Sequence, residues 1–249
     1  MSRIENGGTY TFHTLPYIIS NAKVCIIYET RKLSAIFSVK KSFYPVSFQF
    51  SEKRFIPKLA EFASLVNKGD ITVNAVLKHD IDYRGYEEMI GCDSACYCGT
   101  FDGTCHKILI SIDDEDAGLA LFRFVGKGGT IKNLHVEGEI HAYRERAGGI
   151  VGHMTDGTVS NCFCKVDIVS DHSGQYHYGG IVGRTEGKTL IINSVYNGHI
   201  IAPDGSDIGG LVGWVGSPGT TLRNSLASCD VVLRTLEGLC RRTILLIAP

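Results

Sequence analysis

The stretch that decides the fold is Gly148-Gly149-Ile150-Val151-Gly152, because the chain repeats it. It returns as Gly179-Gly180-Ile181-Val182-Gly183 and as Gly209-Gly210-Leu211-Val212-Gly213, and a degenerate copy follows at Glu237-Gly238-Leu239-Cys240-Arg241. The second glycines of successive copies are separated by 31, 30 and 28 residues. A period of about thirty residues indicates a repeat architecture in which each copy forms one structural unit.

A second marker keeps the same period. Each copy has an asparagine two residues after an apolar residue, at Asn133, Asn161, Asn193 and Asn224. Apolar residues alternate around both markers, which is typical of short strands. Two or three such strands in about thirty residues match one turn of a β-helix. The sequence therefore predicts an all-β fold, a right-handed parallel β-helix (solenoid), with the asparagines stacked as a ladder at one corner.

The side chains expected in the core also follow from the repeat. Ile150, Ile181 and Leu211 hold the same place in successive copies, so they should form one buried column. Cys162 and Cys164 are two residues apart on one strand and should point inward together. Cys229 has a similar place in its coil. We expect these three cysteines to be core residues.

A short amphipathic helix is expected before the repeats. Pro57 opens it, Gly69 closes it, and an apolar stripe runs between them. We expect residues 57–67 to cap the first coil of the solenoid. The predicted organisation is a poorly defined N-terminal segment over residues 1–50 and a β-solenoid over residues 51–249. The expected copies cover about 129–157, 158–187, 188–218 and, in degenerate form, 219–249.

Composition and charge exclude some classes of function. The formal net charge of −1 over 249 residues argues against nucleic-acid binding, which needs a basic surface. No apolar run approaches the roughly 18 residues needed to span a bilayer. The first thirty residues also lack the basic start and small-residue cleavage site of a signal peptide. The sequence therefore predicts no membrane span and shows no export signal.

The order of the motifs resembles that of the bacterial GLUG-repeat surface proteins. The resemblance covers roughly residues 57–236. It rests on Phe62–Gly69, Asp80–Asp82, Gly99–Gly103, Gly129–Leu134 and the Gly-Gly copies. It implies an exported, cell-surface protein with a role in adhesion or display. Such repeats also occur beside the catalytic parts of some immunoglobulin-A peptidases, but the repeat supplies no catalytic residues to carry over.

Two parts of the chain depart from that pattern. Residues 1–50 match nothing in it, and the tail after Arg234 loses the expected glycine pair. A shifted reading frame, a wrong start or a truncated fragment would each explain this. Leu239–Ile247 keeps the apolar character of a strand, so an unpaired edge there would invite self-association through the C-terminal end.

The loops that precede the Gly-Gly motif are the best candidates for a binding surface, with ordinary solvated loops as the alternative. They place aromatic and charged side chains at equivalent positions of neighbouring coils. The candidate binding residues are Tyr143, Arg144, Arg146, His172, Tyr176 and Tyr178. We expect a non-enzymatic scaffold that contacts an extracellular ligand, either a glycan or a host protein.

The alternative is a carbohydrate-active β-helix enzyme, a polysaccharide lyase or glycoside hydrolase, because fold does not decide between these functions. Such an enzyme places carboxylates on one face of stacked coils. Asp80, Asp82 and Asp102 are the best candidates for that role. A groove lined by acids, arginines and aromatic residues from neighbouring coils would distinguish the two hypotheses.

Two clusters remain that could bind a metal ion. Cys92, Cys96, Cys98 and Cys105-His106 fall within fifteen residues, but without paired Cys-x2-Cys spacing. A loop with incidental cysteines, or a disulfide between Cys92 and Cys96, is the alternative to zinc. The run Asp113–Asp116 could hold calcium but lacks EF-hand spacing, which favours a solvated loop. We expect no metal, no cofactor and no catalytic residue.

Overall fold

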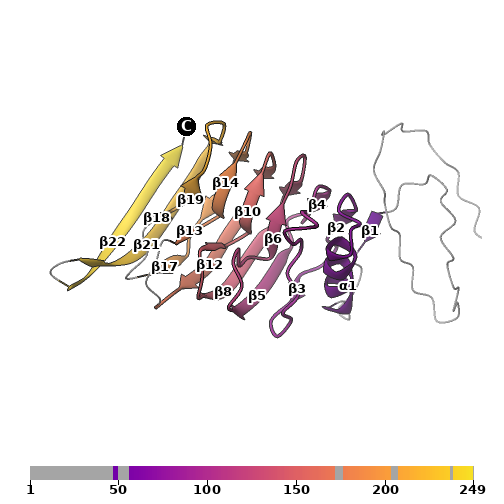
Figure 1. The fold of residues 1–249 in the computed structure, drawn as a ribbon, viewed down its shortest axis with the longest axis horizontal. Helices are drawn as coiled ribbons and strands as arrows, with labels where there is room; N and C mark the ends of the chain where they lie inside the picture. Colours follow the sequence, from indigo (N-terminus) through magenta and orange to yellow (C-terminus); the bar gives the residue numbers. More distant parts are fainter. Residues whose placement is uncertain (1–46, 50–55, 172–175, 203–206, 236–237, 249) are drawn as a thin grey trace, which may run out of the picture.

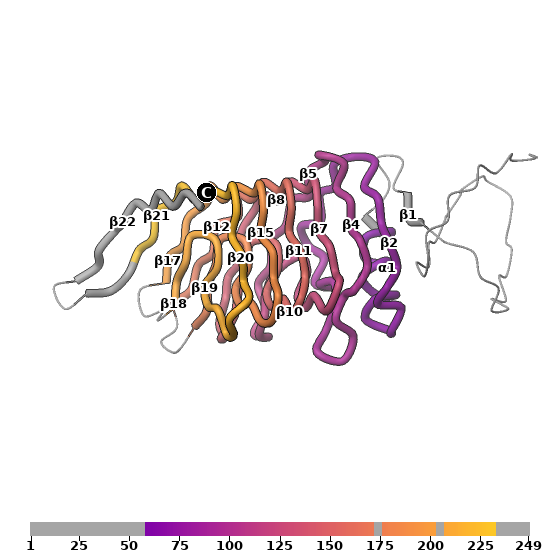
Figure 2. The backbone as a smooth tube through the Cα atoms, turned by 90° about the horizontal axis from the view of Figure 1, so that it is seen from above, coloured from indigo at the N-terminus to yellow at the C-terminus, as the bar shows by residue number. Residues whose placement is uncertain are grey.

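The computed structural model describes residues 47–49, 56–171, 176–202, 207–235 and 238–248. Over these residues the chain is a β-solenoid of about five turns, with one helix at its N-terminal side. Figure 1 shows the coils side by side along the long axis, and Figure 2 shows the same stack from above. The parallel β-helix expected from the repeats is confirmed.

Successive coils build four sheets. The asparagine sheet contains β1 (Ser47–Gln49), β2 (Asn74–Val76), β4 (Thr100–Asp102), β7 (Thr130–Lys132), β11 (Thr158–Ser160), β15 (Leu190–Ile192) and β20 (Thr221–Arg223). The broad sheet contains β3 (Ile81–Asp82), β5 (Lys107–Asp114), β8 (His135–Ala142), β12 (Phe163–Val169), β16 (Val195–Tyr196), β17 (His199–Ile201), β21 (Ser225–Thr235) and β22 (Gly238–Ala248). The narrow sheet contains β9 (Arg146–Gly148), β13 (His177–Gly179) and β18 (Asp207–Gly209). The glycine sheet contains β6 (Phe122–Val125), β10 (Val151–Thr155), β14 (Val182–Glu186) and β19 (Val212–Val215).

The Gly-Gly motif lies at a bend between two strands. The chain leaves the narrow sheet at Gly148 and enters the glycine sheet at Val151. The coils pack closely at this bend: a Cβ on Gly180 would collide with the Tyr196 ring and with the Gly210 carbonyl oxygen. Glycine is therefore required here because of close packing between coils.

The expected buried column is present. Ile150, Ile181 and Leu211 are each 0% exposed. The Ile150 amide donates to the Ile181 carbonyl at 3.1 Å, and the Ile181 amide donates to the Leu211 carbonyl at 3.0 Å. These bonds place equivalent residues of neighbouring coils directly above one another. Burying each apolar side chain stabilises the fold by about 1.5–3 kcal/mol.

The cysteines expected in the core are buried. Cys162, Cys164 and Cys229 are free thiols with at most 4% of their surface exposed. Burial raises the pKa of Cys162 to about 12 and that of Cys229 to about 11. Such thiols stay protonated at neutral pH and behave as small apolar side chains.

The corner asparagines form the expected ladder. Asn133, Asn161, Asn193 and Asn224 adopt φ values of 52°, 53°, 52° and 47°. This left-handed region is strained for most residues but is tolerated by asparagine. The backbone requirement and the ladder of side chains therefore select the same residue type in every coil.

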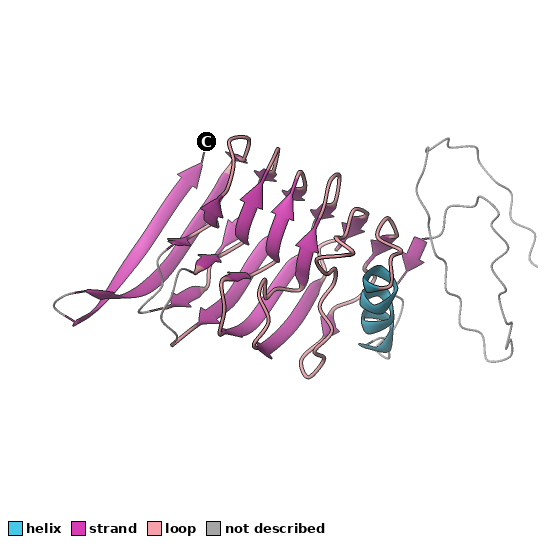
Figure 3. Cartoon of the chain, viewed as in Figure 1, coloured by secondary structure: helices cyan, strands magenta, loops and turns pink. Residues whose placement is uncertain are grey.

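Helix α1 (Ile56–Asn67) covers the N-terminal end of the solenoid, as Figure 3 shows. Its apolar stripe is fully buried and consists of Leu59, Phe62, Ala63 and Val66. The Phe62 ring lies 5.6 Å from the Tyr97 ring and 5.9 Å from the Phe101 ring, so the helix packs on the interior of the first coils. The helix ends at Asn67, and Gly69 two residues later has a φ of 111°.

The two ends of the solenoid differ from the expected boundaries. Strand β1 pairs in parallel with β2 and lies before residue 51, where we expected the solenoid to begin; residues 1–46 lie outside the described part of the chain. After Thr235 the chain does not continue around a further coil. Instead β22 runs back antiparallel to β21, with register from Ser225 opposite Ala248 to Thr235 opposite Gly238.

A search of the described residues for membrane spans found no helix with the length and apolar character needed to cross a bilayer.

Candidate functional site

An open cleft of about 530 Å³ lies over the loops that precede β9 and β13. Three of the predicted binding residues, Tyr143, Arg144 and Tyr176, line it together with Glu115, Ala117 and Glu145. Tyr143 and Tyr176 come from neighbouring coils, so coil stacking brings them together. The cleft therefore combines two phenol side chains, one guanidinium and two carboxylates on one surface.

Tyr143 and Tyr176 each contact a side chain outside the cleft, which restricts their orientation. A hydrogen bond with the Asp113 carboxylate raises the pKa of Tyr143 and ties its loop to the end of β5. The Tyr176 ring stacks on the Tyr178 ring, with centroids 5.5 Å apart and planes 3° from parallel. Both cleft tyrosines are thus held by side chains outside the cleft.

Tyr178 does not lie at the surface, as we had expected, but in the core. Its side chain is 0% exposed, and burial raises its pKa to about 12. The Tyr178 hydroxyl contacts the Arg144 carbonyl oxygen at 3.1 Å and the Ser170 hydroxyl at 3.2 Å. Tyr178 therefore positions the cleft loops and does not contact solvent. Its counterparts in register, Ala147 and Ile208, are apolar, which is the sequence signal for its burial.

Arg146 lies outside the cleft. Arg146 is in β9, and its side chain, 18% exposed, turns toward the glycine sheet, where it contacts His153. His172 lies outside the described residues. Of the five predicted binding residues that the structure describes, three line the cleft.

Arg146 belongs to a second cluster, which we call the arginine–histidine patch. It consists of Arg146, His153, His177, Arg184 and Trp214. Arg146 and His177 are in register in the narrow sheet, and His153, Arg184 and Trp214 are in register in the glycine sheet. The Gly-Gly bend joins these two sheets, so side chains before and after the bend meet on its outer side.

Close contacts hold the patch together. An Arg146 Nη atom lies 2.9 Å from His153 Nδ1. The His177 and Trp214 rings are stacked, with centroids 5.0 Å apart. The Arg184 guanidinium lies 4.3 Å from the centre of the Trp214 ring, within the range of a cation–π interaction. The five side chains therefore form one continuous surface across three coils.

The histidines of the patch are shifted toward their neutral forms. Burial and the nearby Arg146 guanidinium lower the pKa of His153 to about 4. Burial also lowers the pKa of His177, against the opposing effect of the Asp207 carboxylate. At neutral pH His153 is an uncharged imidazole beside a cation, as expected for a histidine with little access to water.

The candidate binding residues predicted from the sequence include only one member of this patch, Arg146. His153, Arg184 and Trp214 each lie four residues after the second glycine of their copy. This shared offset is a signal that the sequence contains, because equivalent positions stack in a solenoid. The predicted binding residues all come from the loops ahead of the motif, whereas the patch uses residues on both sides of it.

The carboxylates considered for catalysis each have structural partners. Asp80 accepts the Lys107 amide at 2.8 Å, which lowers its pKa, and Arg84 lowers the pKa of Asp82 to about 2. Burial opposes ionisation of Asp102, but the hydrogen bond from Asn133 and the Lys132 ammonium lower its pKa overall. A general acid needs a raised pKa, so these three groups are poorly suited to that role.

The cysteine loop and the acidic run form local contacts. Cys92 and Cys96 are free thiols, so the disulfide considered between them is not formed. Cys92 Sγ lies 3.4 Å from the Ser94 hydroxyl oxygen. In the acidic run, Asp116 pairs with Arg123 at 2.8 Å. Within the part of the chain that the structure describes, no group of three or more His, Cys, Asp or Glu side chains could hold a metal ion.

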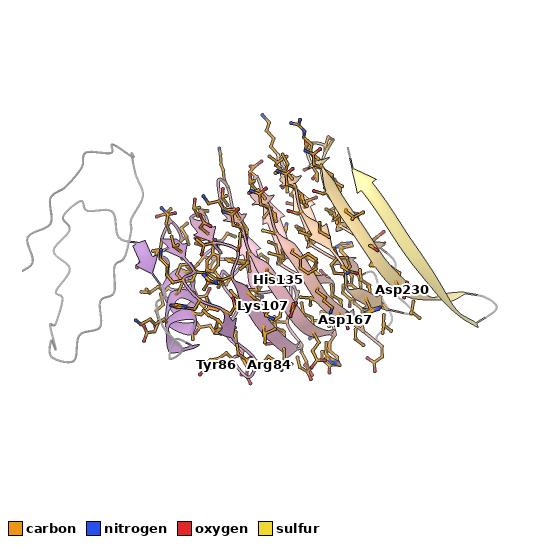
Figure 4. The ribbon with its side chains drawn as sticks, turned by 180° about the vertical axis from the view of Figure 1, so that it is seen from behind. Arg84, Tyr86, Lys107, His135, Asp167 and Asp230 are labelled. Atoms are coloured by element: carbon orange, nitrogen blue, oxygen red, sulfur yellow. The ribbon has the colours of Figure 1, made fainter. Side chains whose placement is uncertain are left out.

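The outward face of the broad sheet is a further polar surface, shown in Figure 4. Lys107 Nζ and His135 Nε2 lie 3.2 Å and 3.0 Å from the two carboxylate oxygens of Glu137. His199 Nδ1 lies 3.0 Å from an Asp167 oxygen on the neighbouring coil. These charges pair along and across coils. Such exposed pairs each stabilise by about 0–1 kcal/mol, so this face fits a structural role.

Part of the chain is similar to a known protein. A segment of the chain is 31% identical over 111 residues to Halomucin from Haloquadratum walsbyi. The match covers 41% of this chain and 1% of Halomucin, so the chain spans only a very small share of the relative it matches. No family model matches the chain.

Proposed function

We propose that this chain is a non-enzymatic repeat scaffold of a cell-surface or secreted protein, and that it contacts a glycan through the cleft. The GLUG-repeat resemblance of its motifs is the reason for proposing an extracellular adhesion or display role. The observation that carries the ligand-contact role is that loops of two neighbouring coils supply Tyr143, Arg144 and Tyr176 to one open cleft.

The chemistry of the cleft supports a glycan over a protein ligand. Tyrosine rings offer apolar faces for sugar rings, and their hydroxyls supply hydrogen bonds. The guanidinium of Arg144 and the carboxylates of Glu115 and Glu145 add donors and acceptors for sugar hydroxyls. Because the cleft is open and follows the coil stack, it suits a polymer that lies across neighbouring coils.

The acid residues give less support to the enzyme alternative. Asp80, Asp82 and Asp102 have lowered pKa values and structural partners. Glu115 and Glu145 in the cleft are both exposed to solvent. A glycosidase acid instead needs an environment that raises its pKa. The scaffold role therefore needs fewer assumptions than hydrolysis or elimination.

The test is affinity electrophoresis of the purified chain in gels that contain soluble polysaccharides, both neutral and acidic. We expect at least one polysaccharide to slow migration of the chain. The same mixtures are assayed for new reducing ends and for unsaturated sugar products, and neither should form.

Variants locate the contact. Tyr143→Ala and Tyr176→Ala should restore free migration, whereas Tyr86→Ala, which removes an exposed tyrosine outside the cleft, should not. Cleavage of any polysaccharide would refute the non-enzymatic role. Unaltered migration in every gel would refute the glycan-contact role.

A further inference from the structure

The arginine–histidine patch contains an unusual concentration of unpaired donors. Four buried side-chain nitrogen atoms of this patch have no hydrogen-bond partner among the described residues. They are Arg146 Nε, His153 Nε2, His177 Nδ1 and Arg184 Nε. A buried donor without a partner costs about 1–3 kcal/mol. Four such atoms in one place point to a ligand that supplies acceptors.

The direction of the hydrogen bonds identifies three of these atoms as donors. Arginine has no acceptor, so the 2.9 Å contact between Arg146 and His153 Nδ1 makes this imidazole nitrogen the acceptor. In neutral His153 the proton is then on Nε2. The Nε atoms of Arg146 and Arg184 are donors in every state. The ligand must therefore bring oxygen acceptors toward the patch.

Arg146 favours an oxyanion over a neutral acceptor, because the other two carboxylates near the patch lie against its other members: Glu186 beside Arg184 and His153, and Asp207 beside His177. Arg146 has a weak counter-ion, since its contact with the exposed Glu145 carboxylate is 3.6 Å long. Arg184 pairs with the Glu186 carboxylate through one Nη atom. Its Nε has no hydrogen-bond partner among the described residues. Charge-assisted hydrogen bonds from guanidinium to carboxylate or sulfate are about twice as strong as neutral ones. Arg146 is thus the main anchor for a negative group.

The patch is also held ready for such a ligand. Trp214 is covered by His177 and Arg184, which fixes the guanidinium plane of Arg184. The backbone positions of all five residues are set by parallel strand pairing. A preorganised set of donors loses little side-chain entropy when a ligand binds.

We propose that the arginine–histidine patch binds the carboxylate or sulfate group of an acidic sugar in a glycan. This inference gives a ligand class to the proposed glycan-contact role and rests on it. Because the patch lies on the strands next to the cleft loops, one polymer could contact both. The cleft then recognises sugar rings, and the patch recognises the negative charge.

The experiment is isothermal titration calorimetry of the full chain with three polymers of similar length: polygalacturonate, dextran sulfate and uncharged dextran. We expect polygalacturonate or dextran sulfate to bind at least ten-fold more tightly than dextran. The two acidic probes distinguish a carboxylate ligand from a sulfate ligand. Free sodium sulfate and sodium galacturonate are used as competitors, and displacement at low millimolar concentration would show that the charged group alone is recognised.

The variants separate a built site from general attraction between charges. Arg146→Gln with Arg184→Gln should weaken binding of the acidic polymer at least ten-fold. Arg146→Lys keeps the charge but lacks Nε, and it should weaken binding about five-fold. Arg223→Gln removes an exposed charge from the asparagine sheet and should leave affinity unchanged. Circular dichroism shows whether the double variant folds. If it does not, the affinities of Arg146→Lys and Arg223→Gln for the acidic polymer are compared instead, and only Arg146→Lys should bind more weakly than the unaltered chain.

Two outcomes would overturn the inference. The first is binding of dextran as tight as that of the acidic polymers, which leaves the glycan-contact role intact but removes the anion site. The second is an equal loss of affinity in Arg223→Gln and Arg146→Lys, which would show that the acidic polymer is attracted by the overall charge of the chain and not by this patch. If the proposed glycan-contact function is wrong, the result is distinguishable from both of these outcomes, because then either no polymer binds or a polymer is cleaved.

Discussion

The side-chain amide of Asn161 donates a hydrogen bond to Asn133 Oδ1 at 3.2 Å, one coil below. Asn193 donates to Asn161 at 3.0 Å and Asn224 donates to Asn193 at 3.2 Å. Asn133 in turn donates to the Asp102 carboxylate at 3.0 Å. Every bond in this ladder has the same direction, so each asparagine satisfies its neighbour while the backbone occupies the left-handed region.

Replacing Asn161 should show both contributions of the ladder. Asn161→Ala loses two side-chain hydrogen bonds and places alanine at a φ of 53°, so we expect a loss of about 2–4 kcal/mol in the free energy of unfolding. Asn161→Gly loses the bonds but relieves the backbone strain and should recover about 1 kcal/mol of this. Urea denaturation measures both. Equal stability of the two variants would contradict the role of backbone strain.

The close packing at the Gly-Gly bend can be tested with a matched pair of glycines. Gly180→Ala would force a Cβ into the Tyr196 ring and the Gly210 carbonyl, so we expect a loss of more than 3 kcal/mol or failure to fold. Gly128→Ala has open space around the Cβ but a φ of +82°, and should cost about 1 kcal/mol. Thermal melting compares them. A similar shift in Tm for both would mean that the bend tolerates a methyl group.

His153 should make stability depend on pH. Its folded-state pKa of about 4 lies below the ordinary value of 6.5, so the unfolded chain binds the proton more tightly. The stabilisation is therefore fully present above pH 6.5 and is lost as the pH falls through about 4. By linkage, the contribution of His153 to the free energy of unfolding should differ by about 3 kcal/mol between pH values above both pKa values and pH values below both.

The variant His153→Gln removes this titration. Its free energy of unfolding should fall less than that of the unaltered chain between pH 6.5 and pH 4, as measured by urea denaturation at each pH. His199→Gln removes an exposed histidine and serves as the control. If both variants follow the pH profile of the unaltered chain, burial of neutral His153 does not contribute to stability.

The C-terminal hairpin should promote self-association. Among the described strands, β22 pairs only with β21, so its second edge offers backbone donors and acceptors to another molecule. We expect light scattering to show dimers or larger species at high concentration. Leu245→Lys should shift the chain toward the monomer, and Tyr86→Lys, which adds the same charge at the other end, should not. A monomer at all concentrations would contradict this prediction.

The sequence by itself determined the features that recur with the period of the repeat. Glycine spacing gave the coil length, asparagine spacing gave the ladder, and the shared place of Ile150, Ile181 and Leu211 gave the core. The helix over residues 57–67 was also predictable, because its apolar stripe and its end signals are local. Each of these features depends on neighbouring residues or on a repeated position, which a single sequence displays directly.

The tertiary structure alone decided how positions combine across coils. It placed Tyr178 in the core although it lies in the segment expected to bind a ligand, because its register partners Ala147 and Ile208 face inward. It paired β22 antiparallel to β21, in a segment where the repeat marker is degenerate. The tertiary structure also places the Arg146 guanidinium in contact with the His153 imidazole across the Gly-Gly bend. Contacts across a bend or between stacked coils depend on strand register and bend geometry, and alternation along the chain specifies neither.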